Sequence, residues 1–182
     1  TVLADTYIPI PAALGPNAPF QFSDMIDTAD EQGRASAATI LDGRVFELVV
    51  VPVLAPLPIA WIVVGVESGN AYVSDLQRIT TVPVEISLAF QNSGGSWVTP
   101  ATTLPQQFRG DLQIALTEPD QFLSGPAVID MGGSDFVTLL AKLKGPSGAS
   151  PVHIILQYSL DVALQPYQPL FLLLIGLAST AL

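Results

Sequence analysis

Residues Val49–Val66 read VVVPVLAPLPIAWIVVGV, an almost wholly apolar stretch close to the length that crosses a bilayer. Three prolines inside it argue against a membrane helix, because each removes a backbone donor and lipid offers the freed carbonyl no water. Most residues around the prolines are Val and Ile, whose branched side chains suit a pleated strand. The stretch therefore predicts an antiparallel hairpin of strands Phe46–Leu54 and Ile59–Val66, with Pro52 at an edge or bulge. Since both faces are apolar, we expect cover on both sides, partly from helices.

The overall composition excludes some classes of protein and of binding partner. The 182-residue chain is 49% hydrophobic and only 12% charged, which excludes a disordered protein. Its net charge is −10 and only 6 residues are Lys or Arg, so it lacks the cations that replace counterions on nucleic-acid phosphates. No cysteine is present, so disulfides, thiol nucleophiles and cysteine-based metal sites are excluded. We expect no nucleic-acid partner.

The chain repeats one pattern. Residues 38–76 and 127–167 both run turn, strand, proline-containing connector, strand and helix. Upstream, TVLADT at the start resembles WVTPATTLP at Trp97, and the second copy has one more strand in front, Val84–Phe90. We therefore expect two tandem units, the first of which lacks its opening strand.

Four helices follow from capping and periodicity. The first starts at a capping Ser23 and closes at Gly33, and the second lies within Gln106–Thr117. A third spans Asn70–Thr80 with Asn70 as cap, and a fourth begins at a capping Asp161. The apolar face predicted for the third helix consists of Tyr72, Val73, Leu76 and Ile79.

The last segment, PLFLLLIGLASTAL (169–182), is uncharged and has no interior proline. One interpretation is a helix packed on the protein's own core. The other is the first part of a membrane helix, which we favour because the segment lacks the polar face of a surface helix.

Four segments carry a resemblance to a known family: LDGRVFELVVVPVLAPLPIAWIVVGV, DLQRITTVPVEISLAF, WVTPATTLP and PVHIILQYSLDVALQPY. They resemble the periplasmic double-Cache sensor region of bacterial membrane signalling proteins. The resemblance implies an α+β fold of two tandem PAS-like (Cache) antiparallel sheets with flanking helices, and a C-terminal helix leading to the membrane. Its units would be residues 1–82 (membrane-distal, lacking its first strand and N-terminal helix), 83–168 (membrane-proximal) and 169–182 (start of the transmembrane helix).

Few residues are suited to catalysis or metal binding. His153, the single histidine, lies in an apolar strand and is interpreted as a strand histidine, although a small hydrolase using it is an alternative. Between residues 24 and 31 lie four acidic side chains whose oxygens could bind calcium, namely Asp24, Asp27, Asp30 and Glu31. An acidic first turn, which is favourable to the helix dipole, explains them more simply. The sequence predicts no catalytic constellation, no metal site and no cofactor.

A ligand pocket would lie between a sheet and its covering loops, although the sequence does not identify the residues that bind the ligand. Aromatic side chains could line such a pocket or belong to the core. The candidates are Tyr7, Phe46 and Trp61 in the first unit and Trp97, Phe136 and Tyr158 in the second.

The resemblance implies a non-catalytic, extracytoplasmic ligand-sensing domain at the inner membrane. It would bind a small molecule or a periplasmic partner, form a homodimer, and relay a signal through the membrane helix. The output domain would follow a HAMP segment and act in c-di-GMP turnover, as a diguanylate cyclase or phosphodiesterase. The alternative is a secreted structural or assembly subunit with an apolar C-terminal packing helix.

Overall fold

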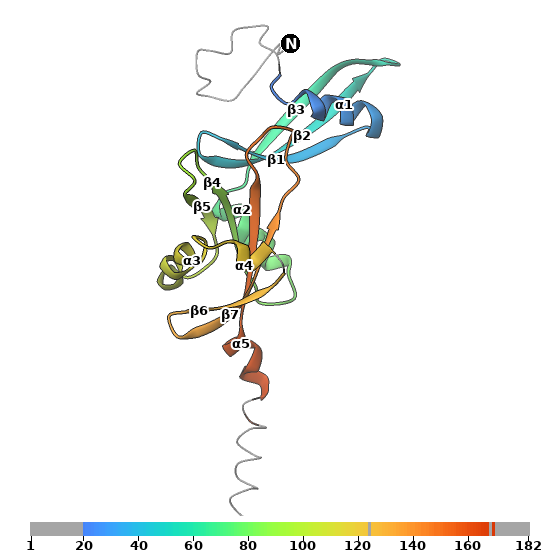
Figure 1. Cartoon of the computed structure of the whole chain (residues 1–182). Helices are drawn as coiled ribbons and strands as arrows, with labels where there is room; N and C mark the ends of the chain where they lie inside the picture. Colours follow the sequence, from blue (N-terminus) through green and yellow to red (C-terminus); the bar gives the residue numbers. More distant parts are fainter. Residues whose placement is uncertain (1–19, 124, 168, 170–182) are drawn as a thin grey trace, which may run out of the picture.

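The computed structural model describes residues 20–123, 125–167 and 169, which form two antiparallel sheets with helices packed on them (Figure 1). The first sheet and its helices are α1 (Ser23–Gln32), β1 (Ala35–Leu41), β2 (Arg44–Leu54), β3 (Pro58–Glu67) and α2 (Asn70–Ile79). The second sheet begins with β4 (Glu85–Gln91) and β5 (Trp97–Thr102), followed by the helical segments η1 (Gln106–Phe108), α3 (Arg109–Ala115) and α4 (Asp120–Leu123). It is completed by β6 (Ala127–Met131), β7 (Ser134–Lys142) and β8 (Val152–Ser159), and the chain then enters α5 (Leu160–Leu164) and η2 (Gln165–Tyr167).

The apolar stretch at 49–66 forms the predicted hairpin. β2 pairs antiparallel with β3, and Pro52 lies opposite Trp61. Pairing of β2 with β1 ends at Val50, so Pro52 lies where β2 is an edge strand and its missing N–H costs no ladder bond. The register shifts between Val53 and Leu54, next to the connector. The prediction of strands rather than a membrane helix is confirmed.

One face of the first sheet packs on α1. Met25 and Ala29 of α1 are buried against Phe46, Leu48 and Val50 of β2. The expected cover on both faces is wrong for β3, because every residue of that strand except Ala60 is exposed among the described atoms. Within the described part of the chain, β3 pairs with β2 alone.

The second sheet has five strands in the order β5-β4-β8-β7-β6, all paired antiparallel. Counted from β4, this order is 2-1-5-4-3, that of a PAS-like sheet. The predicted fold class, α+β with two antiparallel sheets and flanking helices, is confirmed.

The internal repeat is visible in the topology. β1-β2-β3 and β6-β7-β8 are both antiparallel meanders, each preceded by a helix and followed by one. The second sheet adds β4 and β5, and β4 pairs with β8 along the edge that faces away from β7. The equivalent edge of β3, which faces away from β2, has no partner strand among the described residues. The sequence predicted that the first unit lacks its opening strand, and no strand occupies that position among the described residues.

The helix α2 joins the two sheets. Val73 is fully buried in a cluster with β4 and β5 residues such as Leu88 and Ala101. Tyr72 donates its hydroxyl hydrogen to Glu47 of β2 at 3.4 Å. Because α2 belongs to the first repeat in sequence but packs on the second sheet, the boundary at residue 82 stays a prediction.

Three predicted helix caps are wrong by one or two residues. α1 is preceded by Phe22 rather than capped by Ser23, although Gly33 closes it at φ 76° as expected. Asn70 does not cap α2, because its side-chain oxygen accepts a hydrogen bond from the Thr102 amide of β5. Ser159, not Asp161, caps α5 by accepting from the Val162 amide.

Two further predictions concern exposure and the membrane. Ile79, assigned to the apolar face of α2, is 78% exposed at the end of that helix. The segment 169–182 lies outside the described residues apart from Pro169. Within the described part of the chain, no helix combines the length and the apolar character that a bilayer crossing requires.

Candidate functional site

The candidate site lies where α3 and α4 cover one face of the second sheet. Leu112 and Leu116 from the α3 region, together with Phe122 of α4, are almost fully buried against Ile129 of β6 and Phe136 of β7. Phe108 meets Phe136 edge-on, with ring centroids 5.1 Å apart. This packing holds the two short helices at a fixed position over β6.

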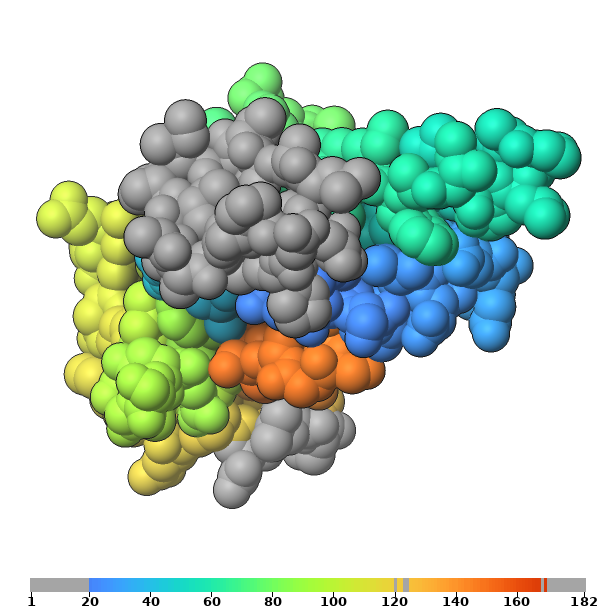
Figure 2. All heavy atoms as spheres, turned by 90° about the horizontal axis from the view of Figure 1, so that it is seen from above, coloured from blue at the N-terminus to red at the C-terminus, as the bar shows by residue number. Residues whose placement is uncertain are grey.

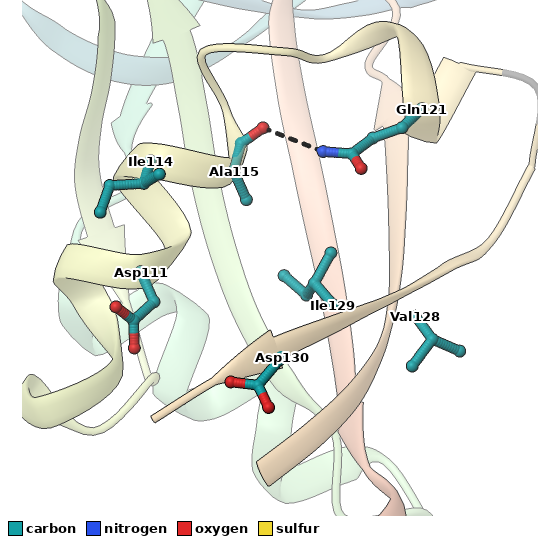
Figure 3. A pocket seen from close by; sticks show the side chains of 7 residues that line it. All are labelled: Asp111, Ile114, Ala115, Gln121, Val128, Ile129 and Asp130. Carbon is teal, nitrogen blue, oxygen red and sulfur yellow. Dashed lines mark hydrogen bonds between the residues drawn. The ribbon is translucent and has the colours of Figure 1, made fainter. Parts of the chain in front are cut away.

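Beside that packed layer is a pocket of about 360 Å³ that opens to solvent (Figure 3). Its volume lies within the range of small-molecule sites. α3 contributes three lining residues, α4 one and β6 three; they are Asp111, Ile114, Ala115, Gln121, Val128, Ile129 and Asp130. Ile129 is 8% exposed and links the pocket to the core, whereas Val128 is 59% exposed. A ligand here would touch both the helices and the edge strand of the sheet.

The polar groups of the pocket are mostly acceptors. Asp111 is half-buried and Asp130 is exposed, and Figure 3 shows both carboxylates on the same side of the pocket. Asp130 accepts a hydrogen bond from the Gly133 amide at 3.0 Å, which fixes it on the β6–β7 turn. Gln121 donates to the Ala115 carbonyl at 3.3 Å and so ties α4 to α3. Two carboxylates with no cation in the lining favour a ligand group that is positively charged or rich in donors.

Behind the pocket layer the sheet buries two polar side chains. Thr138 of β7 and Gln157 of β8 are directly opposite each other, and they are 1% and 0% exposed. Gln157 donates its amide to the Met131 sulfur at 3.4 Å. The Thr138 hydroxyl and the Gln157 carbonyl oxygen have no hydrogen-bond partner among the described residues. A buried polar group without a partner costs free energy, so this pair lowers the stability of the second sheet.

Of the aromatic candidates that the structure describes, none lines the pocket. Phe46 and Phe136 belong to the cores of the two sheets, and Tyr158 is half-buried on β8. Trp61 is 38% exposed and donates its indole N–H to Asp30 of α1 at 2.7 Å. Tyr7 lies outside the described residues. The described aromatic candidates therefore serve packing or tie elements together.

His153 lies on β8 with Trp97 packed edge-on, the ring centroids 5.1 Å apart. Burial, and to a lesser extent the positive charge of Lys142, lowers its pKa from the usual 6.5. Its Nδ1 has no hydrogen-bond partner among the described residues. His153 therefore lies in a strand, as the simpler interpretation predicted, but its buried Nδ1 is neither open to solvent nor hydrogen-bonded among the described residues.

The acidic residues of α1 make structural contacts. Asp24 accepts a hydrogen bond from the Ser147 amide in the β7–β8 loop at 2.7 Å, and Asp30 accepts the one from Trp61. Burial by itself raises the pKa of Asp24, but the hydrogen bonds that it accepts, chiefly from Ser147, outweigh this and lower the pKa below 3.8. Among the described residues, no three His, Asp or Glu side chains come close enough to share a metal ion.

The sheet continues into the last helix without a loop. β8 ends at Ser159, and the same residue caps α5, which starts at Leu160. α5 contacts β7 and β8 and lies at the end of the molecule opposite the first sheet (Figure 1). Any displacement of β8 along its own axis must therefore move the start of α5.

The chain was compared with known proteins. No family model and no curated protein matches it. One solved structure that it resembles is the ligand-binding domain of the amino acid chemoreceptor PctB of Pseudomonas aeruginosa PAO1, in complex with L-Arg. That overlap has a TM-score of 0.42 at 13% sequence identity and covers 85% of this chain and 64% of that chain. The chain thus spans less than two thirds of that domain, and the PAS-like assignment rests on the strand order of the second sheet.

Proposed function

We propose that the chain is an extracytoplasmic ligand-sensing domain that relays a conformational signal through a membrane helix. The observation that carries the proposal is the direct passage from β8 into α5 through Ser159, on a sheet whose outer strand β6 lines a pocket. The second sheet thus has a pocket at one edge, and its central strand leads without a loop into the last helix. A ligand-dependent signal needs both elements.

The path runs through three hydrogen-bonded strands. β6 pairs with β7 over Ala127–Met131, and β7 pairs with β8 over Phe136–Lys142. A ligand that contacts α3, α4 and β6 together favours one spacing of helices and sheet over another. Because the strands are rigidly paired, that preference reaches β8 and tilts or shifts α5.

The ligand in this proposal is a small molecule with a positively charged or donor-rich end. Asp111 and Asp130 would accept from it, while Ile114, Val128 and Ile129 would contact its apolar part. Beyond α5 we place an inner-membrane helix, a HAMP segment and a cytoplasmic output domain for c-di-GMP turnover, working as a homodimer. This last part rests on the family resemblance of the sequence alone.

The pocket is tested with a panel of free amino acids and small amines in a thermal-shift assay. Val128→Trp fills the pocket from an exposed position, and Val82→Trp is the matched control at a position that is 47% exposed away from it. A compound that raises Tm for the native chain and for Val82→Trp, but not for Val128→Trp, supports the site. A compound that stabilises all three proteins equally binds elsewhere.

The relay is tested in a chimaera whose C-terminus is fused to a diguanylate cyclase reporter. Two glycines inserted between Ser159 and Leu160 break the rigid passage from sheet to helix, and the same insertion in the Gly94–Gly95 turn is the control. We expect the first insertion to abolish the response to a compound from the panel and the second to preserve it. An unchanged response after the first insertion would refute the relay.

The second candidate function is a secreted structural or assembly subunit. The exposed, apolar strand β3 favours it, because free edge strands are what assembling β-proteins use to add further chains. Open-ended assembly would appear as species that grow with concentration and have no defined size.

A further inference from the structure

The outer edge of β6 contributes backbone groups to the wall of the pocket. Among the described residues β6 pairs with β7 alone, and Met131 and Ser134 lie opposite each other across the turn Gly132–Gly133. Both glycines have positive φ, 61° and 83°, as a two-residue type I′ turn requires. The residues that flank such a turn exchange both backbone hydrogen bonds, and every second pair along the ladder exchanges none. The amides and carbonyls of Val128 and Asp130 therefore point away from β7.

This edge opens into the pocket and not onto a packed helix. Val128 is 59% exposed, and Ile114 of α3 on the other wall is 69% exposed (Figure 3). Outside the strand ladder, no backbone–backbone hydrogen bond within the described part of the chain involves Val128 or Asp130. The other edge of the sheet differs, because the Thr102 amide of β5 donates to Asn70 of α2 at 3.0 Å. Figure 2 shows the same molecule from above, with the β6 segment at the end of the sheet.

Three carboxylates gather where β6 turns into β7. Asp130 and Asp135 lie directly opposite each other on the two strands, and both are exposed. One carboxylate oxygen of Asp111 lies 3.8 Å from the point where a side chain on Gly132 would begin. Like charges that face each other across a strand pair are destabilising, and no Lys or Arg lines the pocket. A cation delivered to this end of β6 would relieve that repulsion.

The charge on the edge also decides which strands it admits. A charged residue on a free edge discourages pairing with strands that cannot neutralise it. A second copy of this chain, with a net charge of −10, would bring another Asp130 to the edge and is repelled. An incoming strand with a cation opposite Asp130 is attracted instead.

We propose that the ligand of the sensing domain is a short basic peptide that adds to β6 as an antiparallel strand, an inference that rests on the function proposed above. In this mode of binding, main-chain hydrogen bonds to an open edge supply affinity and alternate side chains supply specificity. The peptide residue that pairs with Asp130 is Lys or Arg, and the one that pairs with Val128 is apolar. The residue between them lies opposite Ile129, on the face of the sheet that α3 covers.

The edge accepts only a short match. Within β6 (Ala127–Met131) the outward positions are Val128 and Asp130, and Pro126 and the Gly132–Gly133 turn limit the strand at its two ends. Each outward residue exchanges two hydrogen bonds with its partner. A free amino acid or amine reaches the carboxylates but has too few backbone groups to pair with both positions. The recognised motif is therefore a cation, any residue and an apolar residue, in that order along the antiparallel peptide.

The test is an NMR titration of the isotope-labelled 182-residue chain with acetyl-Gly-Lys-Ala-Val-Gly-amide. The blocked ends leave Lys as the single charge of the peptide. We expect saturable shifts of the Val128 and Asp130 amide signals. The same peptide with Glu in place of Lys should bind at least about 10-fold more weakly. The affinity of the Lys peptide should fall as salt rises from about 50 to 500 mM, because added ions screen the attraction.

Two methylated peptides separate strand pairing from simple charge attraction. N-methylation of the Val in the peptide removes the donor that faces Val128, whereas N-methylation of the Ala changes an amide that points away from β6. We expect the first change to weaken binding about 10-fold or more and the second by less than about 3-fold. The two peptides have the same composition and charge, so each is the control of the other.

Two protein variants test the charge. Asp130→Asn removes the carboxylate but keeps an oxygen that can accept from the Gly133 amide, and Asp27→Asn makes the same change at an exposed position on α1. We expect Asp130→Asn to lose most of the preference for the Lys peptide over the Glu peptide, and Asp27→Asn to keep it. Because the preference is a ratio within one variant, a general loss of stability does not imitate the effect.

Three results would overturn the inference. Equal binding of the two methylated peptides would exclude strand addition. Free lysine that shifts the β6 amides while the peptide does not would exclude the peptide and leave the sensing function standing. If neither the peptide nor any amine shifts these signals, the sensing function at this pocket fails together with the inference.

Discussion

Removal of the Thr138 hydroxyl should stabilise the protein. Thr138 is 1% exposed, faces the fully buried Gln157 on the neighbouring strand, and its oxygen has no partner among the described residues. A buried polar group without a partner costs about 1–3 kcal/mol. Thr138→Val keeps the branched shape and removes that cost, so we expect a gain of about 1–2 kcal/mol, or roughly 2–8 °C in Tm for a chain of this size.

The assay is urea unfolding followed by tryptophan fluorescence and circular dichroism. Thr103→Val makes the same chemical change at a hydroxyl that is fully used, because Thr103 donates to Glu85 and accepts from the Ile86 amide at 2.8 Å. We expect that control to lose about 1–3 kcal/mol. Opposite signs for the two variants support the assignment of an unsatisfied group, whereas a Thr138→Val chain that is less stable than the native chain refutes it.

The other predictions concern pH, the core and the last helix. The pKa of His153 is lowered in the folded protein, so the unfolded chain binds more protons. The free energy of unfolding should therefore fall as pH drops below about 6.5. His153→Gln should flatten that slope in urea titrations at about pH 5–8. Leu112→Ala should cost about 2–5 kcal/mol in the same assay, while Ile114→Ala, at a side chain 69% exposed, should cost less than about 0.5 kcal/mol. Ser159→Ala removes the cap of α5 and should cost about 0.5–1 kcal/mol and speed hydrogen exchange of the α5 amides.

The parts of the fold that the sequence predicted are those decided locally. In Val49–Val66 the branched residues favour strands and the prolines oppose a membrane helix, and the prediction of a β2–β3 hairpin is confirmed. Gly33 closes α1 because a positive φ suits glycine wherever the chain needs it. The repeated order of strand and helix needed only the pattern of apolar residues and turns.

The failures come from contacts between distant residues. Asn70 is a good cap by residue type, but the Thr102 amide, 32 residues away, takes its side-chain oxygen. The pocket was not predicted for the same reason: Asp111 and Asp130 are 19 residues apart, and only the packing of α3 on β6 brings them together. The exposure of β3 was not predicted, because the sequence of an apolar strand does not show whether other elements cover its two faces.

β8 is the central strand of the second sheet, and it also contacts β1 of the first sheet. On one side β7 joins it to the pocket strand β6, and on the other β4 joins it to the surface on which α2 packs. The loop that enters β8 is held by the first sheet, through the Ala38 amide on Lys144 and the Asp24 carboxylate on Ser147. A change at the pocket can reach α5 through β7 and β8, which both contact that helix, whereas a change at the loop held by the first sheet enters through β8.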